Sequence, residues 1–457
     1  MVKEVILIFD VGKTNKKVLL FDKDLNIVSE EESIFEEIPD DDGFNGDDIA
    51  RIEEWVCEKT ERYLEDPSYE VKAINFTTYG ATLMYIDREG RRLTPVYNYL
   101  KPMPEGIVET LYESHGGIDE FCRKTASPAL GMLNSGFQAL WLKRSKPEIY
   151  AKVKSILHFP QYLSYRLTGV LASEHTSIGC HTGLWDFYRM QYHDWVREEG
   201  LNLPDPVPVD RTHPAKMIQS HIPVGIGIHD SSASLVPYFK HTDREFILIS
   251  TGTWCISMNP FNHTPLTSEQ LQQDCLAYLS VQQKPVKSSR FFLGHIHDVN
   301  VKRLNDFFNV DKHAYKRVVP DHDLIDELEQ KSGGKRVFFT KGMPEDFTDR
   351  DAALNRFDGF SQAYHQLMLD LTQLTVNSIK LIIAEGDMTE NLYITGGFSR
   401  NPLFTDLITR SFYGKKVYTS EIANSTSLGA ALILWKCFGI DAEPRIDLGL
   451  KSIEPGR

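Results

Sequence analysis

Two apolar runs near the N-terminus predict the first β-strands of the chain. Residues 5–9 and 17–21 are rich in β-branched and large apolar side chains, and a polar, glycine-containing turn separates them. Residues 246–258 repeat this arrangement, with a strand, a Thr-Gly-Thr turn and a second strand. Because the two predicted hairpins lie about half a chain apart, the pattern indicates a duplicated domain.

Strands and helices alternate in the rest of the sequence, which favours an α/β fold. The pattern predicts strands within 71–86 and 392–395, a Pro-rich connection at 204–223, and helices at 105–112, 135–144, 362–384 and 427–437. The polar stretch at 240–245 separates the two halves. We therefore expect an N-terminal domain of residues 1–242 and a C-terminal domain of residues 243–457.

The bulk properties agree with two folded domains and narrow the range of partners. A chain of 457 residues exceeds what one hydrophobic core usually supports, so a cleft between domains is expected. The net charge of −14 opposes binding to nucleic acid and to anionic membrane surfaces. The six cysteines have no Cys-x-x-Cys spacing, so we expect reduced thiols in a cytoplasmic protein. We expect either a monomer or a homodimer.

The Gly-Lys-Thr segment at 12–14 looks like the end of a Walker A loop, but two features exclude that motif. Leu7 occupies the position where the motif requires a glycine, and a strand follows where a helix is needed. A phosphate-binding hairpin is the alternative, in which Gly12 admits the phosphate and Thr14 and Asn15 donate hydrogen bonds. Asp10, at the end of the first strand, could then hold Mg²⁺ through water. An ordinary polar hairpin tip remains the other interpretation.

The second hairpin offers the same residue types as the first. Residues 250–253, Ser-Thr-Gly-Thr, supply hydroxyl donors and a permissive glycine between two strands. Two such tips that face each other across a cleft could hold one triphosphate. Two unrelated turns of similar sequence are the alternative.

A strand, turn and helix are predicted around Gly396 and Gly397. Asn401 suits a helix N-cap, and Pro402 suits the first helical position. Paired glycines lack the Cβ atoms that would block a flat purine ring, so this turn is a candidate adenine site. A purely structural junction is the alternative.

Asp230 is the strongest candidate for a catalytic group. An apolar strand ends at His229, and the serines at 231–232 can begin a helix, which places Asp230 at a helix N-terminus. The helix dipole favours the carboxylate there. Such a carboxylate suits a base that accepts a hydroxyl proton during phosphoryl transfer. Its alternative role is a helix cap. The His-Ile-His-Asp segment at 295–298 lacks a third metal ligand, so polar surface or cleft residues are the favoured interpretation.

Four motifs in this order resemble those of the FGGY carbohydrate kinases of the actin-like ATPase superfamily, and the likeness covers almost the whole chain. The motifs are the first phosphate hairpin at 10–22, the aspartate segment at 229–235, the second hairpin at 250–254 and the glycine turn at 394–404. The resemblance implies two actin-like, ribonuclease H-like domains around a nucleotide and sugar cleft. It also implies ATP and Mg²⁺ as cofactors, ADP as a product and a small sugar as the substrate.

The resemblance also assigns roles to individual residues. Asp230 is the expected base and Asp10 the expected Mg²⁺ residue. The expected nucleotide contacts are Gly12, Lys13, Thr14, Asn15, Lys17, Thr251, Gly252, Thr253, Gly396, Gly397 and Asn401. The expected sugar contacts are Asp230, Thr78, Tyr79, Gly80, Gln161, Tyr162, Glu174 and Thr176.

Within the family, residues 159–169 and 173–183 look most like rhamnulokinase and related deoxyketose kinases. The expected reaction is therefore phosphorylation of a primary hydroxyl of a small ketose such as rhamnulose or fuculose. Departures at Lys13, at 77–80, at Gln161 and at 97–102 fall in or near the expected pocket. A kinase for xylulose, ribulose or a polyol stays open, as does a nucleotide-binding pseudokinase or regulator. A Rossmann oxidoreductase is disfavoured because the first strand is not followed by Gly-x-Gly-x-x-Gly.

Overall fold

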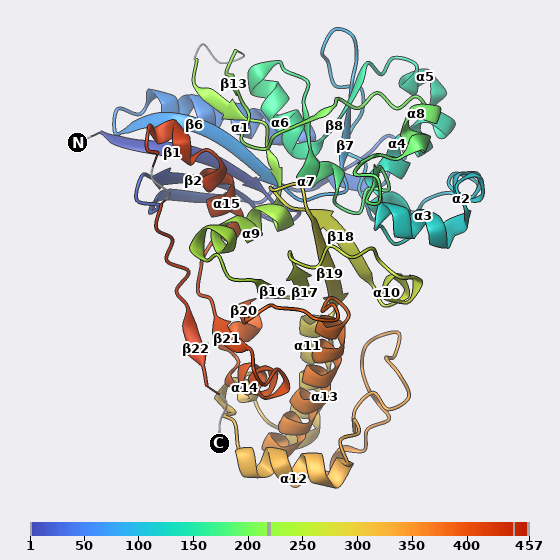
Figure 1. The fold of residues 1–457 in the computed structure, drawn as a ribbon, viewed down its shortest axis with the longest axis vertical. Coiled ribbons are helices and arrows are strands. Elements are labelled where there is room, and N and C mark those ends of the chain that lie inside the picture. Colours follow the sequence, from blue (N-terminus) through green and yellow to red (C-terminus); the bar gives the residue numbers. More distant parts are fainter. Residues whose placement is uncertain (1, 217–220, 442–443, 455–457) are drawn as a thin grey trace.

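The computed structural model describes residues 2–216, 221–441 and 444–454, and it forms two mixed α/β domains. Figure 1 shows one domain above the other, with a β-sheet in each. No helix in these described ranges combines the length and apolarity that a membrane crossing requires.

The sheet of the N-terminal domain is built around the predicted first hairpin. Strand β1 (Lys3–Val11) pairs antiparallel with β2 (Lys16–Asp22), and β2 pairs antiparallel with β3 (Ile27–Ser33). On its other side β1 runs parallel to β6 (Tyr69–Thr78), which is followed by β14 (Pro223–Gly225) and β13 (Thr212–Pro214). The short strand β15 (Ile228–His229) pairs with the end of β6.

The sheet of the C-terminal domain repeats this arrangement. Strand β16 (Phe246–Thr251) pairs antiparallel with β17 (Cys255–Asn259), and β17 pairs with β19 (Pro285–Phe291) and then β18 (Cys275–Leu279). On its other side β16 runs parallel to β20 (Asn391–Gly396), which is followed by β21 (Lys416–Thr419) and β22 (Lys451–Ile453).

Both sheets share an order of three antiparallel strands and, on the far side of the first strand, two parallel ones, and the C-terminal sheet adds β18 as a fourth antiparallel strand. This common order confirms the duplication and the two-domain α/β fold that the sequence predicted.

Side chains alternate along β1, so its two faces enter different cores. Val5 and Leu7 pack against α1 (Ile49–Glu65) and α6 (Phe159–Thr168). Ile6 and Ile8 belong to a second core with α9 (Asp230–His241) and α15 (Ser425–Ile433), two helices that lie between the sheets in Figure 1. Helix α15 thus returns from the far end of the chain to the N-terminal sheet.

The remaining helices complete the two domains. A lobe with its own core extends from the N-terminal sheet and contains β7 (Leu83–Ile86), β8 (Ser155–His158), α2 (Glu109–Ser114), α3 (Gly117–Thr125), α4 (Ser135–Ser145), α5 (Pro147–Tyr150), α7 (His175–Ile178) and α8 (Asp194–Glu198). The C-terminal sheet is covered by α10 (Ser268–Gln272), α11 (Leu293–Phe308), α12 (His322–Ser332), α13 (Phe360–Lys380) and α14 (Pro402–Ser411).

Most predicted elements are confirmed, and the differences are local. Both hairpins and the helix at 135–144 are present, but the helix expected at 105–112 begins only at Glu109. The Pro-rich connection contains β12 (Pro206–Val207) and β13, and residues 217–220 of it lie outside the described ranges. The expected domain boundary falls in the link between α9 and β16, although α15 packs across it.

The contact between α9 and α15 depends on Gly429. A Cβ atom at this position would lie 2.0 Å from the carbonyl oxygen of Ala233 on α9. We expect Gly429→Ala to push the helices apart and lower the free energy of unfolding by about 1–3 kcal/mol. Urea unfolding measures this. Gly359→Ala is the matched control, because nothing lies within 4 Å of a Cβ atom there. Equal stability of the two variants would contradict the prediction.

Candidate functional site

The strand register brings Asp10 and Asp230 to one edge of the N-terminal sheet. Asp10 on β1 is level with Thr77 of β6, and Ile228 of β15 pairs with the same threonine from the other side. The backbones of β1 and β15 are therefore about 10 Å apart, two strand spacings. Asp230 follows β15 directly as the first residue of α9.

Burial raises the pKa of both carboxyl groups to about 6. For Asp10 the Ser427 hydroxyl, which donates to Oδ2 at 2.6 Å, opposes that rise, and the nearby charge of Asp230 adds to it. For Asp230 the Ser231 N–H, which donates to Oδ1 at 2.5 Å, lowers the pKa. The Asp230 side chain has lost much of its hydration, but 34% of its surface remains exposed. It is thus a carboxylate of raised basicity that a ligand can reach.

The tip of the first hairpin and the start of α15 enclose a pocket of about 360 Å³. It brings together the expected residues Asp10, Gly12, Thr14, Asn15 and Lys17. Opposite them lie Asn424, Ser425 and Thr426, which the sequence interpretation missed. A run of Asn, Ser and Thr before an apolar helix is an N-terminus signal that could have found them.

Lys17 and Lys13 of the first hairpin have different partners, and only Lys17 of the two lines the pocket. The Lys17 ammonium donates to Glu30 Oε1 and Asn424 Oδ1, both at 2.9 Å, beside the pocket. The Lys13 ammonium instead contacts Asp47 Oδ2 at 2.8 Å and Glu37 Oε1 at 2.6 Å. Because its ammonium group pairs with Asp47 and Glu37, Lys13 does not line the pocket at the hairpin tip. The sequence had suggested a phosphate contact for this residue.

The second hairpin tip lines a separate pocket of about 440 Å³ in the C-terminal domain. Gly252 and Thr253 lie there with Gly397 and Asn401. The other lining residues were not anticipated as nucleotide contacts: Gly294, His297, Asp298, Tyr315, Lys316, Phe398, Arg400 and Pro402. The His297 ring nitrogens lie 3.0 Å from Asp298 Oδ1 and 3.2 Å from the Tyr364 hydroxyl, so the histidine has protein partners rather than free ligand positions.

Thr251 and Gly396 do not line this pocket, and both have a role in the backbone of the region. Thr251 is 3% exposed, and its hydroxyl accepts the Phe398 N–H at 3.0 Å and donates to the Thr395 carbonyl. Gly396 has φ +87°, and a Cβ atom there would lie 1.8 Å from the Thr251 carbonyl oxygen. Its missing side chain therefore makes room for the backbone of β16.

Four expected sugar contacts are buried inside the N-terminal domain and have protein partners there. Gln161, Tyr162, Glu174 and Thr176 are each at most 1% exposed. Glu174 caps α7 by accepting the N–H groups of residues 176 and 177, Gln161 donates to Glu174 and to the Gly227 carbonyl, and the Tyr162 hydroxyl donates to Glu53. None of them reaches a surface in this structure.

The remaining sugar candidates differ in their access to solvent. Thr78 is fully buried, and its hydroxyl donates to the Tyr79 carbonyl at 2.8 Å. Tyr79 is 8% exposed, and its hydroxyl donates to Asp47 at 2.7 Å. Gly80 is half-buried beside His229. The sequence interpretation missed Tyr99, a half-buried residue whose ring lies 6.1 Å from that of Tyr79. Burial raises the pKa of Tyr99, and the negative charge of Asp230 adds to this rise.

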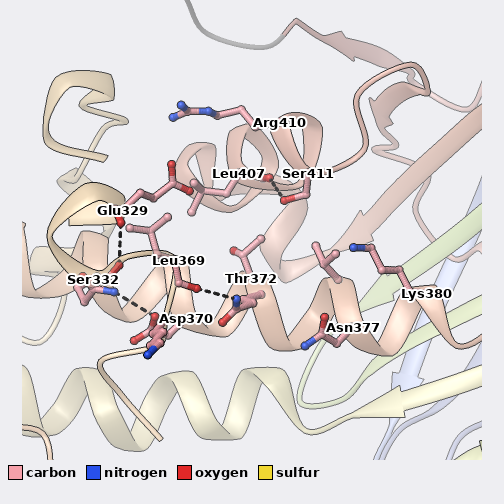
Figure 2. A pocket seen from close by; sticks show the side chains of 15 residues that line it. Glu329, Ser332, Leu369, Asp370, Thr372, Asn377, Lys380, Leu407, Arg410 and Ser411 are labelled. Carbon is pink, nitrogen blue, oxygen red and sulfur yellow. Dashed lines mark hydrogen bonds between the residues drawn. The ribbon is translucent and has the colours of Figure 1, made fainter. Parts of the chain in front are cut away.

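Two other polar features lie outside this arrangement. Asp40, Asp41 and Asp42 could gather around a cation, but Lys101 and Lys146 already pair with them. A cavity of about 450 Å³ lies between α12, α13 and α14, and none of the expected site residues lines it. Figure 2 shows its lining side chains.

The comparisons with known proteins assign the family. The model for the N-terminal domain of the FGGY family of carbohydrate kinases matches residues 5–199, and the model for the carbohydrate kinase FGGY C-terminal domain matches residues 243–442. These matches cover most of the chain, which therefore belongs to the FGGY family of carbohydrate kinases.

Individual relatives are distant. A rhamnulokinase of Yersinia pestis (strain Pestoides F) is 27% identical over 241 residues, 50% of this chain and 48% of that protein. The chain thus spans about half the length of the Yersinia relatives that it matches. A rhamnulokinase of Oceanobacillus iheyensis is 23% identical over 80% of this chain and 79% of that protein.

Solved structures agree on the fold. A carbohydrate kinase from Novosphingobium aromaticivorans has a TM-score of 0.81 at 25% identity, covering 100% of this chain and 95% of that chain. A xylulose kinase from Lactobacillus acidophilus has a TM-score of 0.76 at 16% identity, covering 99% and 94%, and supports the fold alone.

The raised pKa of Asp230 predicts a pH-dependent cost to stability. Its pKa of about 6 in the folded protein exceeds the ordinary value of 3.8, so the folded state binds the proton more tightly. Stability from this group is therefore present below pH 3.8 and is lost as pH rises through 6. We expect Asp230→Asn to raise the melting temperature more at pH 8 than at pH 4, relative to the unmodified protein. An equal shift at both values would contradict the assignment.

Proposed function

We propose that this chain is an ATP-dependent kinase that phosphorylates a primary hydroxyl of a small ketose, with a deoxyketose such as rhamnulose or fuculose as the favoured substrate. The observation that carries the proposal is the position of Asp230. Its reachable carboxylate of raised pKa begins α9, at the same sheet edge as the pocket around the first hairpin tip. The similarity to rhamnulokinases supports the substrate class.

Asp230 acts as the base in the proposed reaction. The sugar hydroxyl oxygen forms a bond to the γ-phosphorus of ATP, and its proton passes to the Asp230 carboxylate. The bond between that phosphorus and the bridging oxygen breaks, and its electron pair leaves with ADP. Because 34% of the side chain is exposed, Asp230 can return the proton to solvent before the next turnover.

The two pockets divide the nucleotide between them in this proposal. Lys17 and the hydroxyl and backbone donors of Thr14 and Asn15 bind phosphate oxygens, with the N-terminus of α15 opposite them. The pocket around Gly397 and Asn401 receives the adenosine. Closure of the domains would bring the two tips onto one nucleotide.

Asp10 fits the proposed Mg²⁺ site. Its carboxylate is a hard oxygen donor, and its pKa is raised by burial and by the nearby Asp230 carboxylate. A divalent cation bound there supplies the positive charge that both carboxylates lack and neutralises charge on the phosphates.

The wall near Asp230 also favours a sugar with fewer hydroxyl groups. Asp47 accepts hydrogen bonds from Lys13, Lys16 and the Tyr79 hydroxyl, so its charge is already satisfied inside the protein. Gly80, which lies beside His229, and the ring of Tyr99, which the charge of Asp230 influences, are both half-buried. We propose these two residues as sugar contacts in place of the buried ones.

Replacement of the base tests the reaction. We expect Asp230→Asn to lower kcat by about 10²–10⁴-fold, because the amide cannot accept the proton. A coupled ADP-release assay over 6-deoxyketoses, other hexuloses and pentuloses measures it. Asp346→Asn, which alters an exposed pair with Arg350, is the control and should match the unmodified chain. A rate for Asp230→Asn within about threefold of the unmodified chain would discard the role. ADP release that no sugar stimulates would instead indicate a regulator.

The two hairpin lysines test the nucleotide geometry. We expect Lys17→Met to raise the KM for ATP by about tenfold or more, because the variant loses one charge-assisted hydrogen bond to a phosphate oxygen. Lys13→Met is the matched variant and should leave that KM within about threefold, because Lys13 pairs with Asp47 and Glu37. Steady-state kinetics at varied ATP measures both. A larger effect of Lys13→Met would reverse the assignment.

A further inference from the structure

The cavity of about 450 Å³ between α12, α13 and α14 is separate from the candidate site. It shares no lining residue with the pocket at the first hairpin tip or with the pocket around Gly397 and Asn401. Asn401 is the N-cap of α14, whereas Arg410 lines the cavity roughly 13 Å further along the same helix. The cavity has a volume in the range usual for small-molecule sites.

One buried hydroxyl group in the wall of this cavity has no partner. Thr372 of α13 is 3% exposed, and its Oγ1 atom lacks a hydrogen-bond partner among the described residues. Thr375 on the same helix is also buried, but its hydroxyl donates to the Leu371 carbonyl at 2.8 Å. A buried polar group without a partner costs stability, so Thr372 calls for a hydrogen-bonding group from outside the chain.

The guanidinium group of Arg410 has one nitrogen in an ion pair and another without a partner. Nη2 donates to Asp326 Oδ1 at 2.6 Å, whereas the buried Nη1 atom has no hydrogen-bond partner within the described ranges. Figure 2 shows Arg410 above Thr372 in the wall of the cavity. Arg410 can therefore donate a charge-assisted hydrogen bond to a ligand and keep its bond to Asp326.

Two lysines add positive charge at the rim of the cavity. Lys380 is the last residue of α13, and Lys335 follows the end of α12. Neither lysine forms an ion pair in the part of the chain that the structure describes. Figure 2 shows the Lys380 side chain extending toward Thr372. Both ammonium groups are thus available to a ligand.

Two carboxylates, Asp370 and Glu329, also line the cavity. Asp370 is already bonded to the protein, because its oxygens accept the N–H groups of Val337 and Phe338 and the amide of Gln366. Glu329 is exposed on α12. Three cations therefore accompany two carboxylates here, in a chain whose net charge is −14. This local excess of positive charge favours an anionic ligand.

We propose that this cavity binds a small organic anion, whose phosphate or carboxylate group is held by Thr372, Arg410 and Lys380. The hydroxyl of Thr372 and the Nη1 atom of Arg410 donate hydrogen bonds to the anionic oxygens, and Lys380 contributes charge. None of these residues belongs to the proposed machinery of phosphoryl transfer. The site therefore goes beyond the proposed function and does not depend on it.

Equilibrium dialysis of the full chain with labelled inorganic phosphate and, separately, labelled citrate tests the proposal. We expect saturable binding of at least one probe, and the tighter probe identifies the anionic group. Thr372→Val keeps the shape of the side chain and should weaken binding of that probe by about fivefold, because one hydrogen bond is lost. Lys380→Gln should weaken it by about tenfold or more, because a charge-assisted contact is lost.

Two matched variants serve as controls. Thr375→Val removes a hydroxyl that bonds within α13, and Lys331→Gln removes an ammonium group that pairs with Glu327 on α12. Neither residue lines the cavity. Both variants should bind the probe within about twofold of the unmodified chain.

Three results would overturn the proposal. One is the absence of saturable binding of both probes, and another is binding that Thr372→Val and Lys380→Gln leave unchanged, which would place the anion elsewhere. The third is displacement of the probe by a non-hydrolysable ATP analogue, because the cavity shares no lining residue with the candidate nucleotide pockets. Circular dichroism checks that each variant is folded. Probe binding at this cavity in a chain without kinase activity would contradict only the proposed function.

Discussion

The close packing of α9 on α15 is the contact on which the candidate site depends. Helix α9 begins with Asp230, and α15 supplies the Ser427 hydroxyl that donates to Asp10. Gly429 lets the two backbones approach to a distance that no other residue type permits. Because α15 belongs to the last part of the chain, both halves of the sequence must fold before the edge of the N-terminal sheet is complete.

This edge holds two carboxylates whose surroundings supply little positive charge. Lys17 lies opposite Asp10 in the register of the first hairpin, but its ammonium group already bonds to Glu30 and Asn424. Burial therefore raises the pKa of both aspartates instead of being offset by an ion pair. Such an arrangement costs stability in the empty protein and favours the binding of cations, which is a common compromise at functional sites.

Local patterns sufficed to predict the hairpins, the helix that begins at Asp230 and the polar tip at 12–15. Each of these features depends on residues that are close in sequence. Side chains alternate between the two faces of β2, so Lys16 is buried while its neighbour Lys17 lies on the other face. The wall formed by 424–426 could not be predicted in the same way, because it meets the hairpin across more than 400 residues of chain. The roles of Lys13 and Thr251 also depended on distant partners, Asp47 in one case and Phe398 in the other.

The residues first expected to contact the sugar show that likeness to a family does not require direct contact with the substrate. Residues 159–169 and 173–183 resemble the deoxyketose kinases, yet Gln161, Glu174 and Thr176 lie one layer behind the surface. Glu174 accepts hydrogen bonds within α7, and Thr176 passes that constraint to the backbone of His229. Such a segment would support the proposed reaction by fixing the residue before the proposed base, without contact to the sugar. Substrate choice would then depend on the half-buried residues proposed as sugar contacts, Gly80 and Tyr99.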